Sequence, residues 1–158
     1  MDDLGRKLKL AVIAVALVAA IAGTGPAGAH KIGNEGCTPG YWKNHTSNWQ
    51  EYRPSSRLGY NFAIPARLAG FRDDTFLQAL KYKGGSGVNG AARILFRSAV
   101  AAYLNAAHEG VGYPYRRFRE PGNLQRQVNR ALASLDRQTM LALAKKLDQA
   151  NNLGCPLS

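Results

Sequence analysis

The chain has 158 residues, and its 21 lysines and arginines outnumber its 10 acidic residues, which gives a net charge of +11 at pH 7. This length leaves room for one domain with a modest core and excludes a second domain of ordinary size. The charge favours anionic partners such as cell-wall polymers, acidic polysaccharide, membrane headgroups or extracellular DNA, although a basic surface can also serve solubility alone.

Residues 1–29 have the pattern of a secretory signal peptide. Three basic residues precede an apolar run at 10–23, and a segment of small residues ends at Ala29. The run has about 14 residues, fewer than the ~20 of a spanning helix, which favours cleavage after Ala29 over an uncleaved membrane anchor. We expect a secreted or cell-surface protein without a stable membrane span, in which residues 30–158 form a single helical domain.

The two cysteines, Cys37 and Cys155, lie near opposite ends of this domain. In an exported chain they most simply form one disulfide. Zinc binding is the weaker alternative, because neither cysteine belongs to a close Cys-x-x-Cys pair. We therefore predict a Cys37–Cys155 disulfide that stabilises the fold.

The stretch 37–45, with the sequence CTPGYWKNH, is the densest in special-purpose side chains. Trp42, His45 and Trp49 fall at helical spacing, which predicts a short helix with its aromatic edge turned inward. The tryptophans are then core anchors with hydrogen-bonded indoles or, alternatively, an exposed platform for sugar rings. The candidate ligand-binding residues of this stretch are Tyr41, Trp42, Lys43, Asn44 and His45.

Residues 51–70 predict an irregular segment, because prolines and glycines interrupt every periodic pattern. Four residues are expected to anchor it to the core: Tyr60, Phe62, Ile64 and Leu68. Asp73 and Asp74 then predict an acidic cap for a helix that begins near Phe76 and ends at Lys83.

Residues 91–107 predict the central helix, because apolar side chains cover most of its circumference. Two further helices follow at 124–132 and around 140–147, the second capped by Ser134 or Asp136. The predicted fold is all-α: a small orthogonal or irregular bundle of about four to five helices with a long irregular N-terminal segment, closed by one disulfide.

Residues 85–90 match G-x-G-x-x-G, the pattern of a dinucleotide-binding turn. That turn follows a strand, and no strand is predicted here. The match is interpreted as a flexible loop between helices with Asn89 as a cap. An anion resting on the free N–H groups near Lys81 and Lys83 is the alternative.

The loop at 111–119 mixes aromatic residues with arginines and is the best candidate for contact with a polyanion by stacking and charge. Alternatively, the loop is a connector anchored by its tyrosines, with its arginines in water. Its candidate binding residues are Tyr113, Tyr115, Arg116, Arg117 and Arg119.

Three stretches carry a resemblance to a known family: GCTPGYWKNH at 36–45, YLNAAH at 103–108 and LDQANNLGCP at 147–156. Together they resemble an uncharacterised domain family of exported bacterial and archaeal proteins that carries a GCTPGYWKNH motif and a C-terminal NNxGCP motif. The resemblance implies export and often a place in larger surface proteins. It implies no catalytic residue and no ligand.

The leading functional hypothesis is a secreted non-enzymatic module that binds or structures an anionic polymer of the cell surface or extracellular matrix, without a cofactor. The chain contains no G-x-S-x-G and no H-E-x-x-H motif. An enzyme acting on polysaccharide is the first alternative, either with copper bound by an N-terminal His30 and by His45 or His108, or with Glu35 and Glu51 as a carboxylate pair. A self-assembling extracellular subunit is the second, and the oligomeric state stays open.

Overall fold

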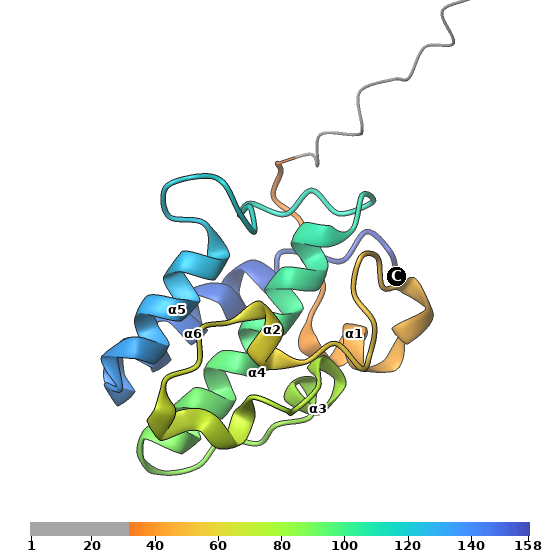
Figure 1. Cartoon of the computed structure of the whole chain (residues 1–158). Helices are drawn as coiled ribbons and strands as arrows, with labels where there is room; N and C mark the ends of the chain where they lie inside the picture. The colour runs from red at the N-terminus through yellow and green to blue at the C-terminus, as the bar shows by residue number, and fades with distance from the viewer. Residues whose placement is uncertain (1–31) are drawn as a thin grey trace, which may run out of the picture.

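The computed structural model describes residues 32–158, so the predicted signal peptide and His30 lie outside the described residues. Within this range the protein is helical, and its only sheet-like contacts are two isolated antiparallel bridges. This confirms the all-α prediction. The α-helices, shown in Figure 1, are α1 (Pro39–Asn44), α2 (Leu58–Asn61), α3 (Phe76–Leu80), α4 (Gly87–Ala107), α5 (Leu124–Ser134) and α6 (Arg137–Asn151). No helix in residues 32–158 is both long and apolar enough to cross a membrane.

Helix α4 is the centre of the bundle, and α1, α3, α5 and α6 all contact it. Most of its residues from Gly90 to Ala107 are fully buried, as the predicted all-round apolar character requires. It begins at Gly87 instead of Ala91, with Ser86 as its N-cap. Asn89 therefore lies inside the first turn, and its predicted capping role is wrong.

The G-x-G-x-x-G stretch is a packing device between helices. A Cβ atom on Gly90 would stand 2.1 Å from the carbonyl oxygen of Gly85, so only glycine lets this loop lie against the start of α4. The first residue of α6, Arg137, donates hydrogen bonds from Nη1 to the carbonyl oxygens of Gly85 (3.0 Å) and Gly87 (2.7 Å). The loop that joins α3 to α4 is thus also held against the start of α6.

The cap predicted for α3 is wrong. Thr75 is the N-cap, and its hydroxyl and the Gln78 side chain form a reciprocal capping box. Asp73 pairs instead with Arg57, and Asp74 accepts a hydrogen bond from the Tyr82 hydroxyl. The helix ends at Leu80, three residues before the predicted Lys83.

One of the two caps predicted for α6, and three of the four core anchors predicted in the segment 51–70, are present. Asp136, one of the two predicted caps, caps α6 through its carboxylate, which accepts a hydrogen bond from Thr139 N. In the segment 51–70, Phe62, Ile64 and Leu68 are buried as expected. Tyr60 is 83% exposed, so its predicted role as a core anchor is wrong.

The Cys37–Cys155 disulfide is present and links residues 118 positions apart. Next to it, the chain on the N-terminal side passes so close to the end of α6 that a Cβ on Gly36 would lie 2.1 Å from the carbonyl oxygen of Ala150. Gly36 N donates to Gly154 O at 2.9 Å, which adds a backbone link beside the disulfide. The two ends of the domain are therefore held together covalently and by backbone contacts.

A buried polar network joins the three stretches GCTPGYWKNH, YLNAAH and LDQANNLGCP. Asn105 Oδ1 accepts hydrogen bonds from Cys37 N (2.7 Å) and Trp42 Nε1 (3.1 Å), and Asn105 Nδ2 donates to Cys37 O (2.8 Å) and to Asn151 Oδ1 (3.0 Å). Asn151 Nδ2 donates to Ser98 O at 3.0 Å. Both asparagines are fully buried, so these bonds replace the water that their amides lose on folding.

Candidate functional site

The inner side of the 37–45 stretch is structural. Thr38 caps α1 by accepting a hydrogen bond from Tyr41 N, and Trp42 is fully buried. Helix α1 ends at Asn44 with His45 as its C-cap, so the predicted helical stripe from Trp42 to Trp49 does not form one helix. Trp42 therefore has no surface to offer a ligand and serves as a core anchor, bonded through its indole to Asn105.

The outer side of the stretch is exposed at Lys43, Asn44 and His45. The His45 ring stacks on Tyr41 with ring centroids 4.2 Å apart, and its Nδ1 donates to Tyr41 O at 2.9 Å. The half-buried Tyr41 donates its hydroxyl to Leu157 O at 3.2 Å. The Tyr41 hydroxyl thus ties α1 to the C-terminal residues, and the His45 ring stacks on Tyr41.

The candidate metal ligands have other contacts. The His108 Nδ1 accepts a hydrogen bond from Gly110 N at 3.0 Å, and burial lowers the pKa of this imidazole. Residues 32–158 contain no group of three or more His, Cys, Asp or Glu side chains that could hold a metal ion. The copper hypothesis depends on His30, which lies outside this range.

The two carboxylates considered as a catalytic pair are each bonded elsewhere. Glu35 Oε2 accepts a hydrogen bond from Gly112 N at 2.6 Å and so fastens the start of the aromatic-arginine loop. Glu51 accepts from Arg117 Nη2 at 2.7 Å. Both glutamates therefore hold the loop at 111–119 in position.

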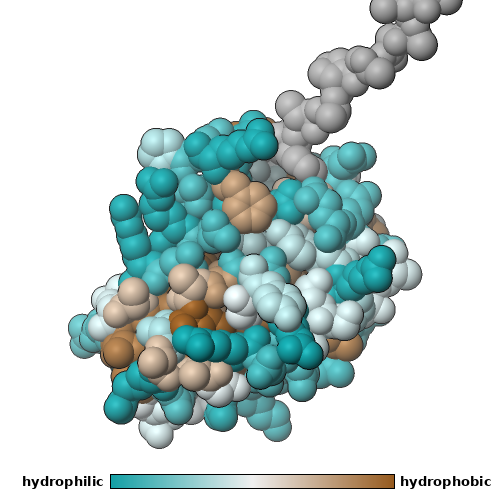
Figure 2. All heavy atoms as spheres, in the orientation of Figure 1, coloured by the Kyte–Doolittle hydropathy of each residue, from teal (hydrophilic) through white to brown (hydrophobic). Residues whose placement is uncertain are grey.

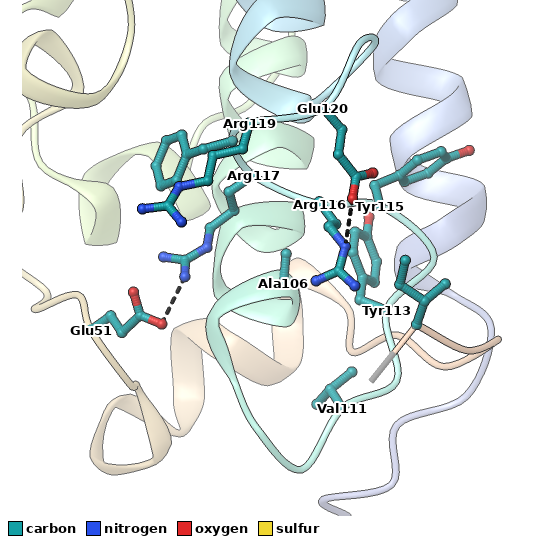
Figure 3. A pocket seen from close by; sticks show the side chains of 11 residues that line it. Glu51, Ala106, Val111, Tyr113, Tyr115, Arg116, Arg117, Arg119 and Glu120 are labelled. Atoms are coloured by element: carbon teal, nitrogen blue, oxygen red, sulfur yellow. Dashed lines mark hydrogen bonds and ion pairs between the residues drawn. The ribbon is translucent and has the colours of Figure 1, made fainter. Parts of the chain in front are cut away.

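The five candidate residues of the loop at 111–119 converge on one cavity of about 410 Å³, here called the loop pocket (Figure 3). Tyr113, Tyr115, Arg116, Arg117 and Arg119 all line it, together with Phe118, two glutamates and a few apolar side chains. Arg116 pairs with Glu120 (Nε–Oε1 2.9 Å) and Arg117 with Glu51, so two of the three arginines are neutralised. The pocket wall is therefore aromatic with hydrogen-bonding groups, and only weakly cationic.

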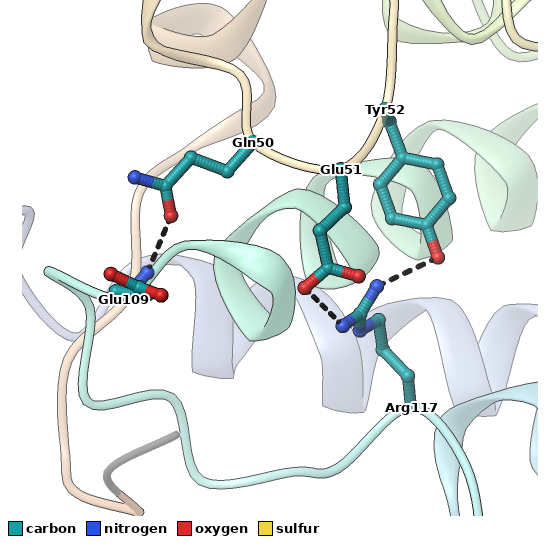
Figure 4. A network of polar contacts seen from close by, with 5 residues as sticks. All are labelled: Gln50, Glu51, Tyr52, Glu109 and Arg117. Carbon is teal, nitrogen blue, oxygen red and sulfur yellow. Dashed lines mark hydrogen bonds and ion pairs between the residues drawn. The ribbon is translucent and has the colours of Figure 1, made fainter. Parts of the chain in front are cut away.

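Arg117 is committed to the fold (Figure 4). Its side chain is 9% exposed and donates from Nη1 to the Tyr52 hydroxyl at 3.0 Å, in addition to the Glu51 pair. Burial opposes the charge of Arg117, but the hydrogen bonds to Glu51 and Tyr52 outweigh it and raise its pKa. Close by, Gln50 accepts a hydrogen bond from Glu109 N at 2.8 Å, so the segment before Tyr52 is tied to the residues that follow α4. Arg117 holds the loop in place and is not available to a polymer.

A second cavity of about 730 Å³ lies along α5, here called the α5 groove. Three arginines line it, Arg119 from the loop and Arg126 and Arg130 from α5, and no acidic residue of the described range does. All three are exposed, and none pairs with a carboxylate of residues 32–158. Three amide side chains, Asn123, Gln125 and Asn129, also line the groove. Asn123 is buried and caps α5, where its Oδ1 accepts from Arg126 N at 2.9 Å and its Nδ2 donates to Glu120 O at 2.7 Å.

The loop pocket and the α5 groove adjoin, because Phe118 and Arg119 line both. Phe118 is 40% exposed and meets Tyr103 edge-on, with ring centroids 6.0 Å apart. The guanidinium of Arg117 lies 5.3 Å from the centre of the Phe118 ring. The Phe118 ring, which lies between the two cavities, is thus held in place by Tyr103 and Arg117. Figure 2 shows apolar residues set among mainly hydrophilic ones on the face seen in Figure 1.

Sequence reasoning missed Arg126 and Arg130 as site residues, because α5 placed them on its solvent side, where charged residues are ordinary. Their i, i+4 spacing on one helix was the available signal. That Arg119 lines the same cavity as Arg126 and Arg130 depends on the path of the loop that leads into α5, and the sequence pattern does not show this path.

The described fold is a disulfide-closed, all-α domain with an adjoining aromatic pocket and arginine-lined groove. No protein-family model, curated protein or solved structure matches the chain.

Proposed function

We propose that this protein is a secreted, non-enzymatic module that binds an anionic polymer of the cell surface or extracellular matrix. The observation that carries the proposal is the α5 groove, where Arg119, Arg126 and Arg130 line one cavity without a carboxylate from residues 32–158. Three like charges in one cavity repel one another, and an anionic ligand relieves that repulsion.

The chemistry of the groove also supports an oxyanion ligand. A guanidinium group presents a planar fork of donors that matches carboxylate, sulfate and phosphate groups. Beside the arginines, Gln125 Oε1 can accept from a polar group of the same ligand, and Asn129 Nδ2 can donate to one. Residues 30–158 carry 18 lysines and arginines and 8 acidic residues, and this excess of positive charge would speed the approach of a polyanion and make binding sensitive to salt.

The surface differs from the one expected at first. Arg116 and Arg117 are neutralised by glutamates, and Trp42 is buried. We assign the polymer contact to Arg119, Arg126 and Arg130, with Tyr115 and Phe118 beside them. Lys43, Asn44 and His45 form a separate exposed edge on α1.

The test measures binding of the secreted protein to heparin, purified wall glycan and DNA over a series of salt concentrations. We expect Arg126→Gln/Arg130→Gln to weaken binding about tenfold or more and to flatten its salt dependence. The matched control is Arg53→Gln/Arg93→Gln, which removes the same charge from two exposed arginines outside both cavities. Absence of binding to all three polymers at low salt would refute the proposal.

A further inference from the structure

The loop pocket and the α5 groove differ in charge although they touch. Among residues 32–158, the lining of the groove carries three arginines and no acidic residue, whereas the lining of the loop pocket carries three arginines and two glutamates. Arg119 belongs to both. A ligand that extends from one cavity into the other therefore passes from a strongly cationic site to a nearly balanced one.

The loop pocket has the composition of a site for a neutral sugar ring. Tyr115 and the partly exposed Phe118 offer aromatic surface, and ion-paired Arg116 and Glu120 offer both donors and acceptors for hydroxyl groups. An acidic sugar there would find Arg116 and Arg117 already paired with Glu120 and Glu51. The pocket is consequently less suited to a charged sugar than the groove is.

The aromatic surface also separates polysaccharide from nucleic acid. Single-stranded nucleic acid is typically bound by several aromatic side chains that stack on successive bases along a cationic groove. Of the residues that the structure describes, Phe118 alone brings an aromatic ring to the α5 groove, where the groove meets the pocket. Along the rest of the track Asn123 is buried as the cap of α5, and the remaining amide groups, Gln125 Oε1 and Asn129 Nδ2, suit sugar hydroxyls.

We propose, building on the proposed function, that the ligand is a polysaccharide in which acidic and neutral sugars alternate. The acidic sugar lies in the α5 groove against Arg119, Arg126 and Arg130, and the neighbouring neutral sugar lies in the loop pocket against Tyr115. Phe118 contacts the chain where it crosses between them. The proposal predicts selectivity for sugar sequence in addition to charge.

Isothermal titration calorimetry with four probes at one low ionic strength tests this. The probes are a hyaluronan oligosaccharide, in which uronic acid alternates with N-acetylglucosamine, an oligogalacturonate, in which every sugar is acidic, a neutral chito-oligosaccharide and oligo-dT. We expect the hyaluronan oligosaccharide to bind about tenfold or more tightly than the oligogalacturonate, despite its lower charge density.

Variants assign the two sites. Arg126→Gln/Arg130→Gln weakens both acidic oligosaccharides, whereas Tyr115→Leu weakens hyaluronan about tenfold and leaves oligogalacturonate unchanged. Tyr115→Phe keeps the aromatic surface and should retain wild-type affinity, which separates a sugar contact from damage to the fold.

The outcomes distinguish this inference from the function on which it rests. Equal affinity for the two acidic oligosaccharides, or equal loss for both in Tyr115→Leu, overturns the alternating ligand and leaves a general polyanion site. Tightest binding of oligo-dT overturns it in favour of nucleic acid. Failure of hyaluronan and oligogalacturonate to bind while heparin or wall glycan still binds overturns the alternating ligand alone, whereas failure of these polymers and of every anionic probe refutes the proposed function itself.

Discussion

Replacement of Asn105 by alanine tests whether the buried polar network holds the domain together. The substitution removes the partners of three groups in fully buried residues: Cys37 N, Cys37 O and Trp42 Nε1. An unsatisfied buried polar group costs about 1–3 kcal/mol, so the three together approach about 3–9 kcal/mol before relaxation. Asn151 Oδ1 keeps its hydrogen bond from the Tyr113 hydroxyl, at 2.8 Å. We expect Asn105→Ala to lower the free energy of unfolding by about 3–5 kcal/mol, a large part of the ~5–15 kcal/mol of a typical domain.

Urea unfolding of the oxidised protein, followed by circular dichroism and tryptophan fluorescence, measures this loss. Asn105→Leu fills the space without restoring the hydrogen bonds, and it should remain as unstable as Asn105→Ala if the orphaned groups dominate. Asn152→Ala is the control, because Asn152 is exposed and its side chain donates only to Asp148 O. A change in Asn105→Ala below about 1 kcal/mol, with the slope against urea unchanged, would refute the structural role assigned to the network.

Two further predictions concern the disulfide and the buried tyrosines. Cys37→Ala/Cys155→Ala should lower the free energy of unfolding by about 4–5 kcal/mol in the chain-entropy model, because the bond closes a loop across 118 positions; urea unfolding that shows less than about 1 kcal/mol would contradict this. Burial raises the pKa of Tyr103 and Tyr113 in the folded protein, whereas an unfolded tyrosine ionises near pH ~10. Their contribution to stability is therefore complete below pH ~10 and is lost as the pH rises above it, because only the unfolded chain then releases these protons. Thermal unfolding and tyrosinate absorbance measured together over this range should show the loss, and a midpoint that stays constant above pH ~10 would contradict it.

Local pattern in the sequence determined much of the fold. The near-continuous apolar surface of 91–107 predicted the buried central helix, and the faces led by Leu124 and Met140 predicted α5 and α6. These signals are legible because helix formation and the burial of one face depend on residues three to four positions apart. The disulfide followed from having only two cysteines in a chain predicted to be exported.

Contacts between distant residues decided the rest. Nothing near Asn105 in the sequence shows that its amide will be shared with Cys37, 68 positions away, and with Asn151. The same holds for Arg117: its sequence context predicts a surface cation, whereas in the structure it donates hydrogen bonds to Glu51 and Tyr52. Whether a polar side chain is buried or exposed depends on which elements pack beside it, and that choice is made by the whole chain.

The candidate site divides in the same way. The sequence by itself marked the aromatic-arginine loop, because its composition is unusual over a few residues. Only the tertiary structure showed that Glu51 and Glu120 neutralise part of that loop and that Arg119 instead joins Arg126 and Arg130 along α5. The physical reason is that charge acts through space: an arginine's availability depends on the carboxylates within a few ångströms, wherever they lie in the sequence.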